Sequence, residues 1–178
     1  MFTVSILTIS DAVSRGQRED VSGDNIEKVI GRLGCQVRKR EVVPDERRQI
    51  AERLRAWADQ DKIDLILTTG GTGLGPRDVT PEATKDIIER EVPGFAEVMR
   101  LESARHNFHA ILSRAVAGAR GKTLVLNLPG SPKGVVENLE LVLPAIPHAL
   151  DILKGIPAEH TPPQGPGQTL SHHADHTQ

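Results

Sequence analysis

Short apolar runs alternate with amphipathic segments along most of the chain. The apolar runs are rich in β-branched and aliphatic residues and end at polar or glycine-rich positions, which predicts β-strands. They cover residues 2–9, 35–43, 65–67 and 123–128. The run at 35–43 carries the most charge, so we expect it to lie nearer an edge of the sheet.

The segments between these runs have helical periodicity. From Asp24, apolar residues recur at i, i+3, i+4 and i+7, and Gly34 ends this helix. A second helix is expected to start at 44–46, and a third to run from Pro81 to about residue 91 with Thr80 as its N-cap. The apolar face of the second helix consists of Ile50, Ala51, Leu54, Trp57 and Ala58.

The second half of the chain is less regular. After a break at Pro93, an amphipathic stretch covers 95–101, and residues 103–122 predict only a mixture of helix and loop. Helical patterns return from 132 to about 143 and end near 153. The alternation of strands and helices predicts an α/β fold, a three-layer Rossmann-like sheet that is mostly parallel, with helices on both faces.

Length and composition limit the domain organisation. The 178 residues suffice for one domain with a substantial core, which we expect to span 1–156. From residue 157 onward the chain is rich in Pro, Gly, Gln, Thr and His and has almost no large apolar residues, which predicts a disordered tail over 157–178.

Charge and cysteine content exclude several classes of protein. A net charge of −2 argues against nucleic acid as the main partner, and no segment approaches the ~18 apolar residues of a membrane span. The N-terminus begins with a strand pattern and lacks a basic region, so we expect no signal peptide. The single cysteine, Cys35, has no internal disulfide partner. A cytoplasmic protein is therefore expected.

Loops that follow predicted strands carry the candidate chemistry. Residues 10–11, the glycine-rich stretch at 70–75 and the loop at 129–132 each come directly after a strand. In a parallel sheet, the carboxyl ends of the strands share one edge, where ligands bind. We therefore expect these three loops to lie together.

The glycine-rich stretch is the most distinctive of the three. It has glycine at 70, 71, 73 and 75, between an apolar run and a helix start, an arrangement that offers backbone N–H groups to an anion. The P-loop pattern fails because Pro76-Arg77 replaces its Lys-Ser/Thr, and the dinucleotide pattern lacks its third glycine. The structural alternative is a plain tight turn, which rarely needs four glycines.

Two acidic residues follow this stretch. Asp78 lies between the loop and a helix start, where it would hold Mg²⁺ against bound phosphates, although it would also form a simple ion pair with Arg77. Glu82 would serve either the helix dipole or the same metal. At the later loop, Ser131 caps a helix, and binding of an anion there is the alternative to simple capping.

Other reactive side chains fit no site. Cys35 has no basic neighbour in the sequence, which favours a core thiol over a nucleophile. His106 and His109 lack further ligands for zinc, and the histidines beyond 157 have no fixed ligand spacing. The chain contains no Gly-x-Ser-x-Gly elbow.

Three motifs together resemble the MoaB/Mog family. They are Thr69-Gly-Gly-Thr-Gly73, Arg77-Asp78-Val-Thr-Pro-Glu-Ala83 and Pro129-Gly-Ser-Pro132, and the resemblance covers roughly residues 2–155. This family includes bacterial molybdopterin adenylyltransferases and the G domains of gephyrin and its plant counterpart. The segment after Gly73 does not decide which branch of the family the chain resembles.

The resemblance implies specific site residues. The two acidic residues that the adenylyltransferases need for activity fall on Asp45 and Asp78, although the residues alone favour a structural role for Asp45 as an N-cap. Asp11 also matches a family position. Ser113 and Arg114 would lie near the pterin pocket, where Arg114 would bind a phosphate bidentately. The expected binding residues are Ser10, Asp11, Gly70, Gly71, Thr72, Gly73, Gly75, Ser113, Arg114, Pro129, Gly130 and Ser131.

The implied reaction converts ATP and molybdopterin to adenylyl-molybdopterin and pyrophosphate with the aid of Mg²⁺. A molybdopterin-binding carrier without catalysis is the main alternative, and a nucleotide-binding hydrolase is a third. The resemblance also implies a homo-oligomer, commonly a trimer, and a separate partner protein for molybdate insertion. Which loop holds the pterin and which holds ATP is open at this stage.

Overall fold

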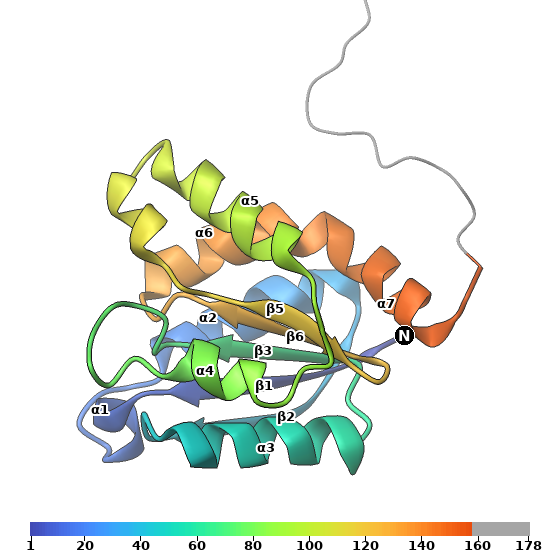
Figure 1. Ribbon diagram of the computed structural model, residues 1–178, viewed down its shortest axis with the longest axis horizontal. Helices are drawn as coiled ribbons and strands as arrows, with labels where there is room; N and C mark the ends of the chain where they lie inside the picture. Colours follow the sequence, from blue (N-terminus) through green and yellow to red (C-terminus); the bar gives the residue numbers. More distant parts are fainter. Residues whose placement is uncertain (158–178) are drawn as a thin grey trace, which may run out of the picture.

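A computed structural model describes residues 1–157, which form a sheet of six strands in the order β2-β1-β3-β6-β5-β4 (Figure 1). The strands are β1 (Thr3–Ile9), β2 (Gln36–Val43), β3 (Leu65–Thr69), β4 (Arg90–Glu91), β5 (Ala117–Arg120) and β6 (Thr123–Leu128). Strands β2, β1, β3 and β6 are parallel neighbours, whereas β5 pairs antiparallel with β6 and β4 antiparallel with β5. The predicted three-layer, mostly parallel α/β fold is confirmed, and β2 lies at an edge as expected.

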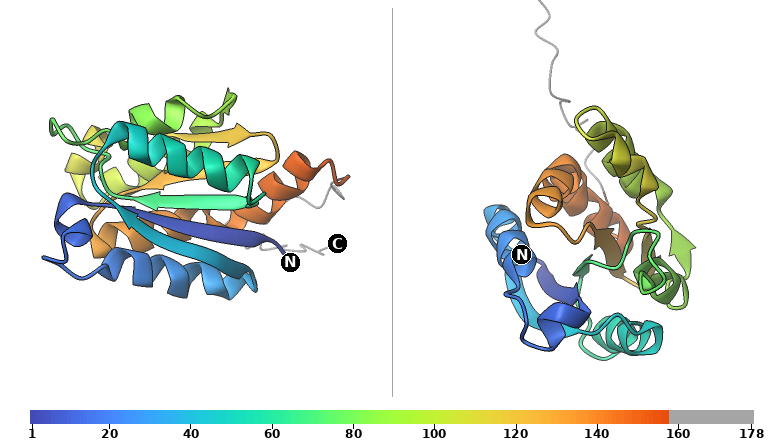
Figure 2. Two further views of the ribbon diagram at one scale, coloured as in Figure 1. Left: turned by 90° about the horizontal axis from the view of Figure 1, so that it is seen from below. Right: turned by 90° about the vertical axis from the view of Figure 1, so that its left-hand side faces the viewer.

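Helices cover both faces of the sheet (Figures 1 and 2). The helices are α1 (Asp11–Ser14), α2 (Val21–Ile30), α3 (Arg47–Asp59), α4 (Thr80–Lys85), α5 (Pro93–Ala104), α6 (Pro132–Val142) and α7 (Ile146–Lys154), with short 3-10 turns η1 (Gly31–Leu33), η2 (Phe108–Leu112) and η3 (Leu143–Ala145). One apolar cluster packs α2, α5, α6 and α7 against the sheet, and the other packs α3 and α4 against its opposite face.

The predicted apolar face of α3 is confirmed. Its five members are all buried, and Trp57 is completely inaccessible to solvent. Burying a large apolar side chain stabilises a fold by roughly 1.5–3 kcal/mol, so this stripe explains why a helix with many exposed arginines docks firmly on the sheet.

Several predicted boundaries were wrong. Helix α2 begins at Val21, because Asp20 caps it by accepting from the Gly23 N–H, and not at Asp24. Helix α4 ends at Lys85, well before residue 91, because the chain turns there into β4. The helix also starts at Thr80 itself, with Val79 at the N-cap position.

The irregular region 103–122 contains structure that the pattern did not predict. Strand β5 has the sequence Ala-Gly-Ala-Arg, in which small residues hide the alternation that marks a strand. On α5, Phe95 and Met99 are buried as expected, whereas Val98 and Leu101 are exposed. The predicted tail falls almost entirely on residues 158–178, outside the described residues, so the domain boundary stays a prediction. Within 1–157, none of the helices has the length and apolar character needed to cross a bilayer.

Candidate active site

The carboxyl ends of the parallel strands meet at one edge of the sheet. This edge lies at the left of Figure 1 and faces the viewer in the right-hand view of Figure 2. The loops after β1, β2, β3 and β6 all emerge there, so the structure brings together the three loops that were expected to converge. The start of β5, which runs antiparallel to β6, adds Ser113 and Arg114 to the same edge.

The glycine-rich loop after β3 has its carbonyl groups occupied and its N–H groups free. The carbonyls of Gly70 and Gly71 accept from the hydroxyl and N–H of Thr80, at 2.8 and 3.1 Å. Those of Thr72 and Gly73 accept from the N–H and Nε of Arg114, at 2.9 and 2.7 Å. The N–H groups of residues 71–74 donate to no acceptor among residues 1–157.

This asymmetry fixes the direction of the free N–H groups. A trans peptide plane points its C=O and its N–H in opposite directions, so a bond to the carbonyl of residue i orients the N–H of residue i+1. The four occupied carbonyls at 70–73 therefore aim the four free donors at 71–74 away from Thr80 and Arg114. Free, oriented N–H groups form an anion-binding concavity.

The glycines are required by space and by backbone conformation. Gly70 and Gly71 have φ of 98° and 65°, in the left-handed region that favours glycine. A Cβ at Gly70 would lie 2.2 Å from the Ile9 carbonyl oxygen. At Gly73 and Gly75 a Cβ would lie 2.9 and 2.8 Å from Oδ2 of Asp78, which accepts from the Gly75 N–H at 2.8 Å.

Carboxylates from three loops gather beside this loop. Asp11 and Asp45 exchange hydrogen bonds: the Asp11 N–H donates to Oδ2 of Asp45 at 2.7 Å, and the Asp45 N–H donates to Oδ1 of Asp11 at 3.1 Å. Arg77, two residues after the glycine-rich loop, forms ion pairs with both other loops: its Nη2 lies 3.0 Å from Oδ1 of Asp11 and 2.8 Å from Oε1 of Glu46. The N-cap of α3 is Glu46, so Asp45 is not the helix cap that its position suggested.

The pKa values of the two hydrogen-bonded carboxyl groups, Asp45 and Asp11, are shifted in opposite directions. Burial raises the pKa of the Asp45 carboxyl, and the negative charges of Asp11 and Asp78 raise it further. The hydrogen bond from Arg77 lowers the pKa of Asp11. Oδ1 of Asp45 and Oδ1 of Asp78 accept no hydrogen bond within residues 1–157, which leaves these oxygens available to a ligand.

Arg114 and Glu82 form an ion pair behind the glycine-rich loop. Arg114 also donates to the Asp78 carbonyl at 2.6 Å, so its guanidinium binds the loop from two sides. Burial raises the pKa of Glu82, but the hydrogen bond and charge of Arg114 outweigh this and leave it lowered. Arg114 thus has protein partners where a phosphate was expected, and Glu82 is engaged where a metal was expected.

The loop after β6 repeats the same asymmetry. The carbonyls from Leu128 to Pro132 accept, in order, from the Gly70 N–H, the Thr69 hydroxyl, the Ser22 hydroxyl, the Val135 N–H and the Asn25 amide. The N–H groups of Gly130, Ser131 and Lys133 donate to nothing in the described part of the chain. The Ser131 hydroxyl caps α6 by accepting from the Gly134 N–H at 3.1 Å, as predicted.

The two loops touch each other and border a cleft. A Cβ on Gly130 would lie 3.1 Å from the Cα of Gly70, so a larger residue there would push the two loops apart by a few tenths of an ångström. Next to them, a cleft of about 740 Å³ opens between α5, η2 and α6. Its wall includes Thr72, Ser113 and Ser131 from the candidate site, and Ser103, Asn138 and Met99 from the helices.

The predicted residues therefore divide by location. Asp11, Asp45 and Asp78 lie on one side of the glycine-rich loop, and Ser113, Pro129 and Ser131 line the cleft together with Thr72 and Gly73 of that loop. Ser10 accepts from the Val13 N–H at 3.3 Å and caps α1. Within 1–157, no three His, Cys, Asp or Glu side chains are grouped so that they could hold a metal ion by themselves.

Sequence reasoning missed the residues that occupy the loop carbonyls. Thr69, Thr80, Ser22 and Asn25 were not singled out for this role, because their partners lie up to 108 residues away in the sequence. The only local signal was the capping pattern at Asp20, three residues before Gly23, which marks the start of α2 and hence the position of Ser22.

Comparisons with known proteins agree with this fold. Residues 5–148 match a family model described as a probable molybdopterin binding domain. The chain is 45% identical over 154 residues to a molybdopterin adenylyltransferase from Helicobacter pylori strain J99, with 85% of the chain and 88% of that protein covered. It is 34% identical over 173 residues to a molybdopterin adenylyltransferase from Haemophilus influenzae, with 88% and 86% covered. Among solved structures, the molybdopterin biosynthesis enzyme MoaB from Thermus thermophilus is 55% identical, with a TM-score of 0.84 and coverage of 88% and 99%.

Proposed function

Because the chain belongs to this family of probable molybdopterin binding domains, we propose that it transfers the adenylyl group of ATP to molybdopterin. The observation that carries the proposal is the pair of adjoining loops whose free, oriented N–H groups lie beside a carboxylate cluster. Both substrates bring phosphates to the reaction, and free, oriented N–H groups are a common way in which proteins bind phosphate.

Adenylyl transfer depends more on the positioning of the two substrates than on proton transfer. An oxygen of the terminal phosphate of molybdopterin attacks the α-phosphorus of ATP, a new P–O bond forms, and the bond to the β-phosphate breaks. Pyrophosphate leaves with the bonding electrons. The attacking phosphate monoester is already anionic, so no strong general base is needed, and catalysis rests on alignment and on neutralisation of charge.

The chain's own residues supply the alignment. In this proposal the donors at 71–74 and those at 130, 131 and 133 hold phosphate oxygens on either side of the contact between Gly70 and Gly130. The cleft beside the loops takes the pterin ring. Its wall combines apolar Met99 with the hydrogen-bonding side chains of Ser103 and Asn138, as a flat heterocycle with polar edges requires.

Asp45 and Asp78 fit a Mg²⁺ that arrives with the phosphates. Each has a carboxylate oxygen without a protein partner in the described residues, and the charge of Asp78 helps to raise the pKa of Asp45, as expected where a cation would relieve repulsion. Glu82 fits less well because Arg114 already pairs with it. When bound, the ion would neutralise charge on the triphosphate.

Assembly and location are further parts of the proposal. Val98 and Leu101 expose apolar surface on α5, with exposed fractions of 42% and 67%, which supports the homotrimer implied by the resemblance. Sedimentation equilibrium measures the state directly. The use of ATP supports a cytoplasmic location, and a separate protein would insert molybdate into the adenylylated product.

Asp78→Asn tests the function most directly. Purified protein is incubated with molybdopterin, ATP and Mg²⁺, and adenylyl-molybdopterin and pyrophosphate are followed. The variant should lose at least about 100-fold in kcat, because a carboxylate that faces the phosphates is replaced by a neutral amide. The matched control is Asp61→Asn, which removes an exposed carboxylate that pairs with Lys39 away from the site.

The outcomes separate the two candidate functions. Pterin-dependent pyrophosphate release by the wild type that is lost only in Asp78→Asn supports the transferase. Tight binding of molybdopterin without product in any of the proteins would establish the carrier and refute the transferase. A folded Asp78→Asn that works at the wild-type rate would refute the placement of the site.

A further inference from the structure

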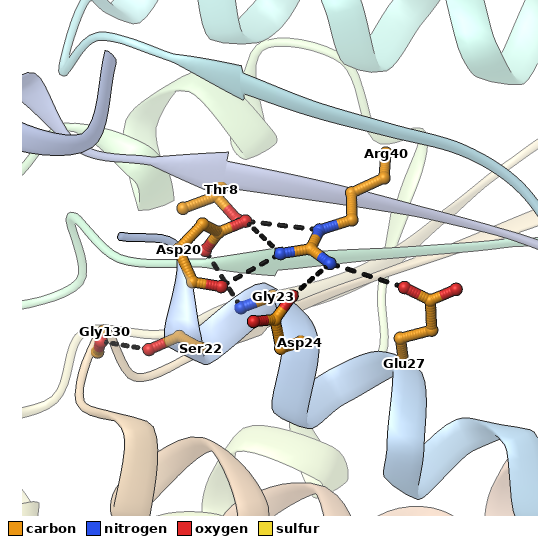
Figure 3. Close-up of polar contacts among 8 residues, drawn as sticks. All are labelled: Thr8, Asp20, Ser22, Gly23, Asp24, Glu27, Arg40 and Gly130. Carbon is orange, nitrogen blue, oxygen red and sulfur yellow. Dashed lines mark hydrogen bonds and ion pairs between the residues drawn. The ribbon is translucent and has the colours of Figure 1, made fainter. Parts of the chain in front are cut away.

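An arginine on β2 organises the start of α2 close to the candidate site (Figure 3). Nη2 of Arg40 lies 2.8 Å from Oδ2 of Asp20 and donates to the Asp20 carbonyl at 2.9 Å. Its Nη1 lies 2.5 Å from Asp24 and 3.4 Å from Glu27. The buried hydroxyl of Thr8 lies 2.9 Å from both oxygens of the Asp20 carboxylate. Asp20 is thus held from two neighbouring strands.

The same carboxylate fixes the first turn of the helix. Asp20 accepts from the Gly23 N–H at 3.0 Å, and its side chain is only 12% exposed. A Cβ at position 23 would lie 2.3 Å from Oδ2 of Asp20 and 2.9 Å from Nε of Arg40, so a larger residue there would displace both side chains. The backbone between Asp20 and Gly23 therefore has little freedom, and this backbone carries Ser22.

Ser22 connects this fixed turn to the loop after β6. Its hydroxyl donates to the Gly130 carbonyl at 2.8 Å, and its side chain is buried, as Figure 3 shows for the contact. One turn later, the Asn25 amide donates to the Pro132 carbonyl at 3.1 Å. A cap for α2 alone needs neither bond, because Asp20 already supplies it.

The bond from Ser22 determines where one donor of the site points. The carbonyl of Gly130 and the N–H of Ser131 belong to the same peptide plane and point in opposite directions. With the carbonyl held against α2, the Ser131 N–H must point away from that helix. Asn25 fixes the Lys133 N–H through the Pro132 carbonyl in the same way.

We propose that Ser22 is a positioning residue for the phosphate-binding loop at 129–132, and that Asp20 and Arg40 hold it in place. Ser22 acts through the Gly130 peptide. Loss of its hydroxyl lets that peptide rotate, so the loop loses affinity for phosphate while the chemistry at the α-phosphorus is retained. The turnover part of this inference rests on the proposed function, whereas the binding part does not.

The test compares Ser22→Ala with Arg32→Ala. Arg32 lies in η1, directly after the end of α2 that is remote from the loop, and contacts α6 through an exposed ion pair with Glu140 at 2.7 Å. We expect Ser22→Ala to raise the KM of one substrate about five- to tenfold with kcat changed less than about twofold, as for lost ground-state binding. Arg32→Ala should change neither constant. The substrate whose KM rises is the one whose phosphate the loop holds.

A binding measurement makes the test independent of turnover. Titration calorimetry with inorganic pyrophosphate should show a Kd for Ser22→Ala that is about five- to tenfold higher than that of the wild type. A change of this size corresponds to the loss of about one hydrogen bond. Ser22→Thr keeps the hydroxyl and should restore most of the affinity, which a loss of packing would not explain. If the wild type binds pyrophosphate without any turnover, the proposed function fails while this comparison still decides the role of Ser22.

Clear outcomes overturn the inference. Wild-type KM values and pyrophosphate affinity in a folded Ser22→Ala would refute it, as would equal losses in Arg32→Ala. If Ser22→Ala does not fold, Asn25→Ala decides, because the Asn25 side chain makes an exposed bond that fixes the neighbouring peptide. A loss of pyrophosphate affinity in Asn25→Ala, smaller than the five- to tenfold expected of Ser22→Ala, supports the proposal, and wild-type affinity in Asn25→Ala refutes it.

Discussion

The loop after β3 and the loop after β6 orient their free N–H groups in the same way, by occupying the carbonyls behind them, but they do so with different groups. Arg114 and Thr80 bind the first loop, with Glu82 balancing the charge of the arginine. Thr69, Ser22 and Asn25 bind the second loop, and all three are neutral.

This difference has an energetic consequence. Hydrogen bonds that involve a charged donor are worth roughly 1.5–3 kcal/mol, against about 0.5–1.5 kcal/mol for neutral ones. Removing Arg114 also leaves Glu82 without its partner, whereas removing Ser22 leaves no charge behind. The first loop should therefore be the more sensitive of the two to substitution.

The largest expected effect is that of Arg114→Ala. The variant frees the Gly73 and Asp78 carbonyls at once, so the Leu74 N–H, which the bond to the Gly73 carbonyl orients, loses its support, and the chain from Gly73 to Asp78 is no longer held at either end. We expect kcat/KM for adenylyl transfer to fall about 100-fold or more, since a misplacement of about 1 Å costs that much. Steady-state kinetics measures the loss.

Arg120→Ala is the matched control for this variant. Arg120 lies at the other end of β5 and likewise combines a backbone carbonyl, that of Ile87 at 2.8 Å, with a carboxylate, that of Asp59 at 2.6 Å, although Arg114 binds two carbonyls. It should lose similar stability and keep its activity. If both variants lose activity in proportion to the decrease in their melting temperatures, the loss reflects stability alone. Arg114 then has no particular role in orienting the loop after β3, and the contrast between the two loops fails.

An intermediate effect is expected of Thr80→Val. The hydroxyl of Thr80 is fully buried and donates to the Gly70 carbonyl, and valine has the same shape without the hydrogen bond. The affinity for pyrophosphate should fall about tenfold, more than in Asn25→Ala, because a buried carbonyl is left unpaired. Calorimetry on both variants ranks them, and a loss for Thr80→Val that is equal to or smaller than the loss for Asn25→Ala would contradict the order that we infer for the two loops.

The smallest effect is a shift in pH dependence. In the proposal Asp45 acts as a carboxylate, so activity is lost as the pH falls through its pKa, which burial raises and the negative charge of Asp11 raises further. Asp11→Asn removes that charge, so the acid limb of the kcat/KM profile should move to lower pH by less than about one unit. Ser22→Ala should leave the limb in place, because the Ser22 hydroxyl bonds to a backbone carbonyl among the described residues. A limb that moves to higher pH in Asp11→Asn would contradict the assignment.

The sequence predicted those parts of the molecule in which local pattern and global position agree. Apolar runs gave the parallel strands, and the five-residue stripe from Ile50 to Ala58 gave the buried face of α3. Strands β4 and β5 were missed, because β4 has two residues and β5 is made of small ones. Their presence depends on pairing with β6 and with each other, and not on their own periodicity.

The candidate site was predictable to the same extent. The glycine-rich loop was evident because four close glycines are informative without any partner. The role of Arg114 was not, because its bond to Gly73 spans 41 residues and follows from the turn that brings β5 back along β6. For Asp45, the local pattern favoured a helix cap, and its bond with Asp11, 34 residues away, takes the place of that cap.

The occupied carbonyls also bear on the kinetics of ligand capture. A phosphate that reaches the loops at 70–75 and 129–132 meets donors that already point outward, so no segment has to order itself around the ligand. Association should then be a single fast step at a rate set by encounter. Variants that free a carbonyl should differ from the wild type mainly in the dissociation rate of the ligand. The residence times measured for such variants would therefore rank the carbonyl hydrogen bonds of each loop by their contribution to ligand binding.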